Sequence, residues 1–316
     1  MTIRAFTITA ALLLATPAFA QTPPAERQVS VSAIPGIVAA GAQWKTVWSG
    51  ADDADGIVGT SDGGAIFAQR EVNRVRKVDA DGKTSVLVEN TDSAGSLAID
   101  YQGRILGVLR DHPAVAILSP EHKLLTDNYY GAKFQGAADL VVEKRGGMYI
   151  TESRRTPWPS VYYLAPDGKM FSFGDGMRAN GIALSPDEKT LYISNRDNIV
   201  IVELRPDGTG SNSRHESEKL HGQGVNADGM TVDAAGRVYV STQTGVQILS
   251  PDGKFIGEIP SPRIVTSVAF SGPDKKMLFI ITRGSKTADG AESKLPTART
   301  IYAIPMVAQG YLGRAK

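Results

Sequence analysis

Runs of apolar residues separated by turn residues recur along this 316-residue chain, in a pattern that predicts short β-strands. The clearest example is residues 178–195. There an apolar run is followed by Pro186-Asp187, which favours a tight turn, and then by a second run of apolar and β-branched residues. Residues 228–241 give the clearest second copy. The chain is therefore expected to be built from repeated β-hairpins.

Six copies of this unit can be placed, with starts roughly 40 residues apart, which is the spacing of four-stranded propeller blades. They cover residues 55–68, 95–108, 138–151, 180–194, 228–241 and 266–281. Third and fourth strands follow most copies, often around a Pro-Asp-Gly turn such as those at 166–168, 206–208 and 251–253. Proline presets φ and glycine accepts a positive φ, so each such turn marks a further hairpin.

Six units of four strands predict an all-β fold, a six-bladed β-propeller, because a closed ring protects the edges of its sheets. Ring closure requires one blade built from both ends of the chain. A strand at residues 44–48 precedes the first copy and another at 300–305 follows the last, so we expect these two to share the sixth blade. Residues 41–316 would then form a single domain. Two β-sandwiches are the alternative, but they would not require one repeat through the whole chain.

The N-terminus has the features of an export signal. Arg4 supplies a positive start, residues 5–15 are apolar but too short to span a bilayer, and an A-x-A cleavage motif ends at Ala20. A buried N-terminal helix is the alternative. We expect a signal peptide at residues 1–20, a flexible lead-in at 21–40, and a periplasmic or secreted mature protein.

Composition excludes several classes of function. The formal net charge is +1 and no long block of like charge occurs, so neither a nucleic-acid partner nor membrane insertion is expected. The chain has no cysteine, which excludes disulfides, thiolate nucleophiles and cysteine metal sites. A small molecule is the expected partner, and the oligomeric state is left open.

Propeller geometry brings the opening residues of the six first strands together at one end of the central channel. These residues are Asp55, Gly95, Ala138, Asn180, Asp228 and either Thr266 or Ser267. Carboxylate and amide oxygens suit one divalent cation, Ca²⁺ first, with Mg²⁺, Mn²⁺ or Zn²⁺ in its place. The alternative is that Asp and Asn before Gly only form strand-entry turns.

The residues that follow each second strand surround the same mouth, and five of the six copies carry an arginine there. The candidates for substrate binding are Arg196, Arg154, Arg110 and Arg283. Guanidinium groups suit a carboxylate or phosphate on a small substrate, although arginine is also common on exposed loops. His221, on a loop seven residues before Asp228, is the histidine expected to overhang the mouth as an acid or base.

Residues 179–195 and 227–240 resemble the SMP-30/gluconolactonase/LRE family of six-bladed propellers, and the resemblance covers roughly residues 50–310. Members of this family are typically lactonases or related metal-dependent hydrolases with one divalent cation, often Ca²⁺, at the channel mouth. The resemblance implies that Asn180 and Asp228 are metal ligands and that Asp228 is also the general base.

Two positions depart from the family pattern. Where the family has Glu-Gly-Pro in the first blade, residues 55–57 read Asp-Gly-Ile, so the carboxylate of Asp55 is one methylene shorter. Where the third blade has Pro-Asn-Asp, residues 137–139 read Ala-Ala-Asp, and Ala138 replaces the asparagine ligand. Water or Gln135 would fill that place.

The leading hypothesis is an exported metal-dependent hydrolase that opens a lactone or a small ester. A metal held by Asp55, Asn180 and Asp228 would polarise the carbonyl, and Asp228 would take a proton from the attacking water. The rival hypothesis is a catalytically degenerate propeller that binds a small molecule or a protein at the same mouth. Ala138 favours the binding module, whereas the retained Asn180 and Asp228 favour the enzyme.

Overall fold

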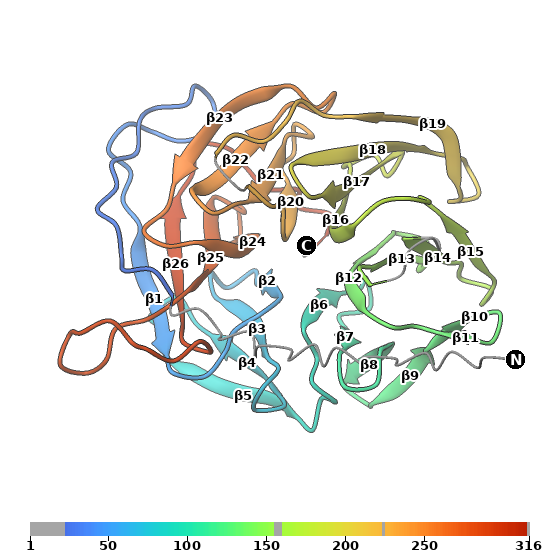
Figure 1. Ribbon diagram of the computed structural model, residues 1–316, viewed down its shortest axis with the longest axis horizontal. Coiled ribbons are helices and arrows are strands. Elements are labelled where there is room, and N and C mark those ends of the chain that lie inside the picture. Colours follow the sequence, from blue (N-terminus) through green and yellow to red (C-terminus); the bar gives the residue numbers. More distant parts are fainter. Residues whose placement is uncertain (1–22, 155–159, 223–224, 315–316) are drawn as a thin grey trace, which may run out of the picture.

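Six four-stranded antiparallel sheets surround a central axis in the computed structural model, which describes residues 23–154, 160–222 and 225–314 (Figure 1). The all-β six-bladed propeller expected from the sequence is confirmed. Within these described ranges no helix is long and apolar enough to cross a membrane. The predicted signal peptide at residues 1–20 lies outside them.

Each blade begins with its innermost strand. The first strands are β2 (Ile57–Gly59), β6 (Ser96–Ile99), β12 (Ala137–Val142), β16 (Ala179–Leu184), β20 (Met230–Val232) and β24 (Val265–Ser271). The later strands of blades one to three are β3 (Ala65–Gln69), β4 (Arg74–Val78), β5 (Thr84–Glu89), β7 (Ile105–Leu109), β8 (Ala114–Ser119), β9 (Lys123–Thr126), β13 (Met148–Glu152), β14 (Val161–Leu164) and β15 (Met170–Phe173). Those of blades four and five are β17 (Thr190–Asn195), β18 (Asn198–Leu204), β19 (Gly210–Glu216), β21 (Val238–Ser241), β22 (Gly245–Leu249) and β23 (Phe255–Pro260). A short hairpin of β10 (Asn128–Tyr129) and β11 (Ala132–Lys133) precedes blade three.

The sixth blade contains strands from both ends of the chain, as predicted. Its sheet order is β24, β25 (Met277–Arg283), β26 (Arg299–Pro305) and β1 (Lys45–Gly50), with β1 antiparallel to β26 at the outer edge. The register pairs Trp48 with Ile301 after an irregularity in β1. Hydrogen bonds between the two ends of the chain therefore close the ring.

The inner strands are mostly apolar and mostly buried because neighbouring blades cover both of their faces. All six residues of β12 are buried, for example, whereas the outermost strand β19 is mostly exposed. Each core cluster joins adjacent blades. Tyr239 of blade five packs edge-on against Phe270 of blade six, with ring centroids 4.9 Å apart. Burial between blades thus fixes the position of each first strand at the axis.

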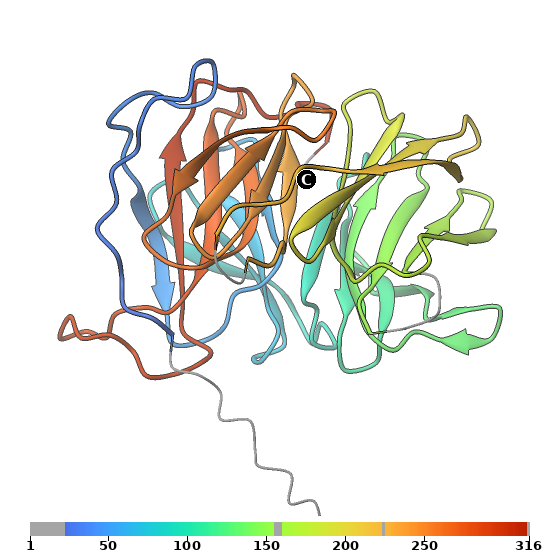
Figure 2. The same ribbon diagram turned by 45° about the horizontal axis from the view of Figure 1, so that its top comes forward.

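The segment before β1 is packed against the propeller. Val31, Ile37 and Val38 are buried in the core cluster that includes Tyr239 and Phe270. Figures 1 and 2 show this blue segment running along the outside of the last two blades. The packed domain therefore begins earlier than residue 41, because part of the expected lead-in covers apolar surface of blades five and six.

The C-terminal segment lies across the end of the channel opposite the strand-opening residues. Gly310 donates to the Lys275 carbonyl of blade six, and the side chain of Lys275 donates to the Arg314 carbonyl. Arg314 in turn donates to Glu188 at 3.0 Å and to the Leu184 carbonyl at 2.6 Å, both in blade four. These contacts join the turns of blades four and six, which are separated by blade five, so the tail stabilises the closed propeller.

We expect Arg314→Ala to lower the free energy of unfolding by about 2–4 kcal/mol, because it removes a buried ion pair and charged hydrogen bonds. Urea denaturation of the purified protein measures this change. The control is Lys219→Ala, since Lys219 forms an exposed ion pair with Asp197 and exposed pairs contribute about 0–1 kcal/mol. Equal losses in the two variants would contradict a stabilising role for the tail.

Candidate functional site

Glycines allow the first strands of neighbouring blades to approach closely at the mouth of the channel. A Cβ on Gly181 would overlap the carbonyl oxygen of Asp228 in the next blade, and one on Gly56 would lie 2.5 Å from Ser96 Cα. Neither glycine has a positive φ. Asp55-Gly56 and Asn180-Gly181 are therefore not strand-entry turns, and the glycine serves the contact between blades.

The residues predicted to open the strands occupy equivalent backbone positions. The amides of Asp55, Gly95 and Asp228 each donate to the second strand of their own blade, to the carbonyls of Ala68, Val108 and Ser241. In blades three, four and six the first strand is irregular at this point, between residues 137 and 140, 179 and 182, and 265 and 267. The side chains of Asp55, Asn180, Asp228 and Thr266 at these positions line the cavity, whereas Gly95 has no side chain and Ala138 does not belong to the lining.

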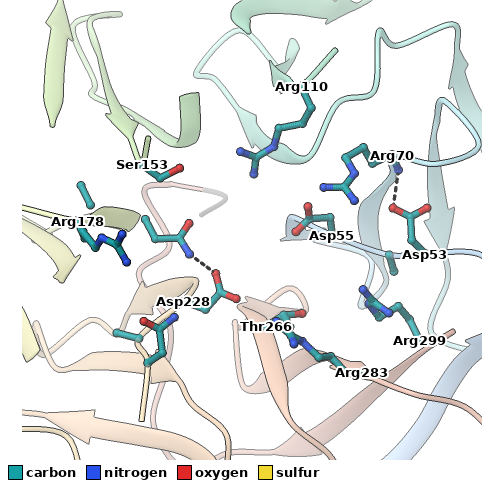
Figure 3. Close-up of a pocket in the computed structure, with 15 residues that line it drawn as sticks. Asp53, Asp55, Arg70, Arg110, Ser153, Arg178, Asp228, Thr266, Arg283 and Arg299 are labelled. Atoms are coloured by element: carbon teal, nitrogen blue, oxygen red, sulfur yellow. Dashed lines mark hydrogen bonds between the residues drawn. The ribbon is translucent and has the colours of Figure 1, made fainter. Parts of the chain in front are cut away.

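A cavity of about 540 Å³ occupies the mouth. Its lining is mostly charged or polar, and every blade contributes to it. The described lining residues are Asp53, Ala54, Asp55, Arg70, Arg110, Ser153, Arg178, Ala179, Asn180, Asn226, Ala227, Asp228, Thr266, Arg283 and Arg299 (Figure 3). Asp55, Asn180 and Asp228 are thus brought together, with Thr266 beside them. This volume lies within the range of small-molecule sites.

Asn180 and Asp228 are in direct contact. The side-chain amide nitrogen of Asn180 donates to Asp228 Oδ1 at 2.7 Å (Figure 3). The side-chain oxygen of Asn180 takes no part in this hydrogen bond. Burial and the nearby negative charge of Asp55 raise the pKa of Asp228 to about 7, with Arg283 acting in the opposite direction. A carboxylate that titrates near neutral pH is suited to accept and return a proton.

The other two aspartates in the cavity differ in their surroundings. Asp53 accepts hydrogen bonds from the backbone amides of Arg70 at 3.0 Å and Glu71 at 3.1 Å, so it shapes the loop after β3. Burial raises the pKa of Asp53. Asp55 has no side-chain hydrogen bond to the part of the chain that the structure describes, and Figure 3 shows it between Asp228 and Arg70. Asp55 is therefore the carboxylate available to a ligand.

Two of the four arginines predicted for substrate binding line the cavity. Arg110 and Arg283 do so, and the side chain of Arg110 donates to the backbone carbonyls of Ala137 at 2.6 Å and Ala138 at 3.0 Å. Arg154 packs over Gly136 and is exposed, and Arg196 is exposed on a turn with φ 62°. Neither of these two belongs to the lining, and both are exposed.

His221 lies away from the cavity. Its ring stacks on Phe255 with centroids 4.0 Å apart, and its backbone is held by Gln247 of β22. Gln135 does not belong to the lining of the cavity either. Ala138 is buried, and its backbone carbonyl accepts a hydrogen bond from the guanidinium of Arg110. His221 thus lies beside the outer strands of blade five instead of overhanging the mouth.

Two lining arginines were missed from the sequence. Arg178 precedes a first strand and Arg299 begins the third strand of blade six, whereas only residues after second strands were considered. Arg299 pairs in register with Arg283 across β25 and β26. Burial and the neighbouring guanidinium groups lower the pKa of Arg299. Arg299 could have been found from the sequence as the residue that pairs with the predicted rim residue Arg283 once β25 and β26 are aligned.

The oxygen donors of the cavity fit one divalent cation. No cluster of three or more histidine, cysteine, aspartate or glutamate side chains suited to a metal occurs in the described ranges. The candidate set instead combines two carboxylates, Asp55 and Asp228, with the amide of Asn180. A cation beside them would offset the cost of burying Asp228 and the repulsion between Asp228 and Asp55.

Comparisons with known proteins place the chain among relatives of known name. Residues 66–284 match the profile of the SMP-30/Gluconolactonase/LRE-like region. A gluconolactonase of Zymomonas mobilis is 27% identical over 254 residues, which cover 68% of this chain and 71% of the relative. A 6-deoxy-6-sulfogluconolactonase of Pseudomonas putida is 36% identical over 230 residues, covering 68% of this chain and 78% of the relative.

Solved structures show the same fold. A gluconolactonase of Xanthomonas campestris superimposes with a TM-score of 0.71 at 23% identity, covering 90% of this chain and 97% of the other. A calcium-binding regucalcin of Agrobacterium tumefaciens superimposes with a TM-score of 0.66 at 18% identity, covering 85% of this chain and 95% of the other. At these identities the similarity supports the propeller architecture.

We expect Asp228→Asn to raise the melting temperature of EDTA-treated protein at pH 8 and to have little effect at pH 5. The folded pKa near 7 lies above the ordinary value of 3.8. The protonated form is therefore favoured by folding, and its stabilising contribution is lost as the pH rises towards and through 7. The amide removes the charge that the folded state must otherwise accommodate at pH 8.

Thermal melts over this pH range test the prediction, with the exposed turn residue Asp252 changed to Asn as the control. Added Ca²⁺ should raise the melting temperature of the wild type at pH 8, by an amount set by its concentration relative to Kd. A variant that is less stable than the wild type at both pH values would contradict the electrostatic interpretation.

Proposed function

The chain belongs to the SMP-30/gluconolactonase/LRE-like family, and from this premise we propose that it is a metal-dependent hydrolase that opens a lactone or a related small ester. The observation that carries the proposal is the hydrogen-bonded pair of Asn180 and Asp228 beside Asp55 in the cavity at the mouth. Relatives named as lactonases support the reaction class. The fold alone would not, because propellers host many activities.

In the proposed reaction, Asp228 removes a proton from a water molecule as the water oxygen bonds to the carbonyl carbon of the lactone. The ring C–O bond then breaks, and Asp228 returns the proton to the departing ring oxygen. The product is an open-chain hydroxy acid, so one water is consumed and no other reactant is needed.

Asn180 is proposed to orient Asp228 through its amide hydrogen bond, which leaves the other oxygen of the carboxylate facing the cavity. Asp55, Asn180 and Asp228 are the residues that would hold a divalent cation, Ca²⁺ first. When bound, the cation would polarise the carbonyl oxygen and stabilise the oxyanion. Arg110 adds positive charge on the far side of the same cavity.

Lactone hydrolysis by the wild type and by Asp228→Asn tests this proposal. Glucono-1,5-lactone and 6-deoxy-6-sulfogluconolactone, for which two relatives are named, form the first panel. We expect activity that EDTA abolishes and Ca²⁺ restores, and a loss of about 10²–10⁴-fold in kcat on removal of the general base. A pH-stat records the acid released.

The matched control is Asp252→Asn on an exposed turn, which should retain the wild-type rate. Equal rates in the wild type and Asp228→Asn would exclude the proposed base. The absence of hydrolysis in every protein, with metal bound, would favour the alternative in which the propeller is a binding module.

Export to the periplasm or beyond is part of the proposal, since residues 1–20 have the features of a cleavable signal. Mass spectrometry of the protein from its producing cells should return Gln21 as the first residue. An N-terminus at Met1 on mature, active protein would contradict export by this route.

A further inference from the structure

The cavity at the mouth contains more positive charge than its own carboxylates can balance. Among the described residues, five arginines and three aspartates line it: Arg70, Arg110, Arg178, Arg283 and Arg299 against Asp53, Asp55 and Asp228. Placing several guanidinium groups around one small cavity is electrostatically costly unless anions compensate for them. The excess therefore calls for a ligand of opposite charge.

Few of these arginines have an anionic partner in the described part of the chain. Arg70 pairs with the exposed Glu71, but no ion pair within 4.0 Å involves Arg110, Arg178, Arg283 or Arg299. Arg299 instead directs one nitrogen to the backbone carbonyls of Pro296 and Ala298. Guanidinium groups held by backbone carbonyls keep their remaining donors for a ligand.

Two of the three carboxylates accept hydrogen bonds from amide groups and not from the arginine side chains of the cavity. Asp53 accepts the backbone amides of Arg70 and Glu71, and Asp228 accepts the amide of Asn180. Only Asp55 remains, and it belongs to the candidate metal-binding set. The three carboxylates offset part of the positive charge of the five arginines, and an excess of two positive charges remains among the described lining residues.

The arginines are unevenly distributed around the reacting groups. Figure 3 shows Arg70, Arg299 and Arg283 on the same side of the cavity as Asp55, whereas Arg178 lies on the other side. Arg283 and Arg299 are cross-strand partners on β25 and β26, so two guanidinium groups come from adjacent positions of one blade. Two adjacent guanidinium groups can share the oxygens of one anion.

We infer that the substrate carries an anionic group besides the ester that is hydrolysed, and that Arg283 and Arg299, with Arg70 beside them, bind that group. The inference rests on the proposed lactonase function, because it places the ester at Asp228. Carboxylate, phosphate and sulfonate share the required chemistry, a compact group with several acceptor oxygens. The charged and polar lining also indicates a hydrophilic molecule, such as the lactone of an acidic sugar.

A matched pair of lactones tests this inference. Glucono-1,5-lactone and its 6-phosphate have the same ring and differ in one anionic group. We expect the wild type to show a kcat/KM about 10- to 100-fold higher for the phosphorylated lactone, the contribution of one or two charged hydrogen bonds. A glucarolactone, with a carboxylate in place of the phosphate, shows which anion is preferred.

Arginine variants then locate the binding site. Arg283→Gln and Arg299→Gln should each lower the ratio of kcat/KM for the charged lactone over the neutral one by about tenfold. Arg154→Gln is the matched control, because Arg154 is an exposed arginine of the same rim that does not line the cavity. Thermal melts establish that each variant is folded. Arg283→Gln is the substitution least expected to disturb folding, because Arg283 is exposed.

The outcomes separate the two proposals. Hydrolysis of both lactones at equal efficiency, or a ratio unchanged in Arg283→Gln and Arg299→Gln, overturns the anion inference and leaves lactonase activity standing. If neither lactone is hydrolysed, calorimetry with 6-phosphogluconate and gluconate tests the anion site alone. Binding of 6-phosphogluconate that is at least about tenfold tighter, and that weakens in Arg283→Gln, supports the site; equal binding overturns it.

Discussion

The close approach of neighbouring first strands at the channel mouth is the contact on which the site depends. Gly181 lies against the Asp228 carbonyl, and Gly56 lies against the backbone of Ser96. Without a Cβ at these positions, the strands can approach to backbone contact, and the side chains immediately before the glycines are brought together. The bond from Asn180 to Asp228 is a consequence of this spacing.

The rest of the molecule holds that spacing. Core clusters between blades fix the tilt of each sheet, and the antiparallel pair of β1 and β26 closes the ring. At the opposite end of the channel, Arg314 links blade four to the C-terminal segment. A blade that shifted outwards would widen the cavity. The geometry of the mouth therefore depends on closure of the ring.

Charge in the cavity is arranged in two parts. Asp228, Asp55 and Asn180 concentrate oxygen donors where a cation would fit, and burial there keeps the pKa of Asp228 near neutral. Arg283 and Arg299 place positive charge on adjacent strands of blade six. The carboxylates of the cavity can therefore bind a metal while the arginines bind an anionic substrate. The positive metal and the negative substrate also attract each other, which favours the binding of both.

The sequence by itself determined the repeat, the blade number and the closure of the ring, because these depend on local hydrophobic pattern and turn chemistry. It also identified Asp55, Asn180 and Asp228 as a converging set, since equivalent positions of a repeat meet at its axis. Side-chain direction on the rim was decided only by the tertiary structure. Arg154, Arg196 and His221 were placed at the mouth from their position in the chain, but turn geometry and stacking direct them elsewhere. Arg299 enters the cavity because β26 lies beside β25, a contact between segments that no local pattern specifies.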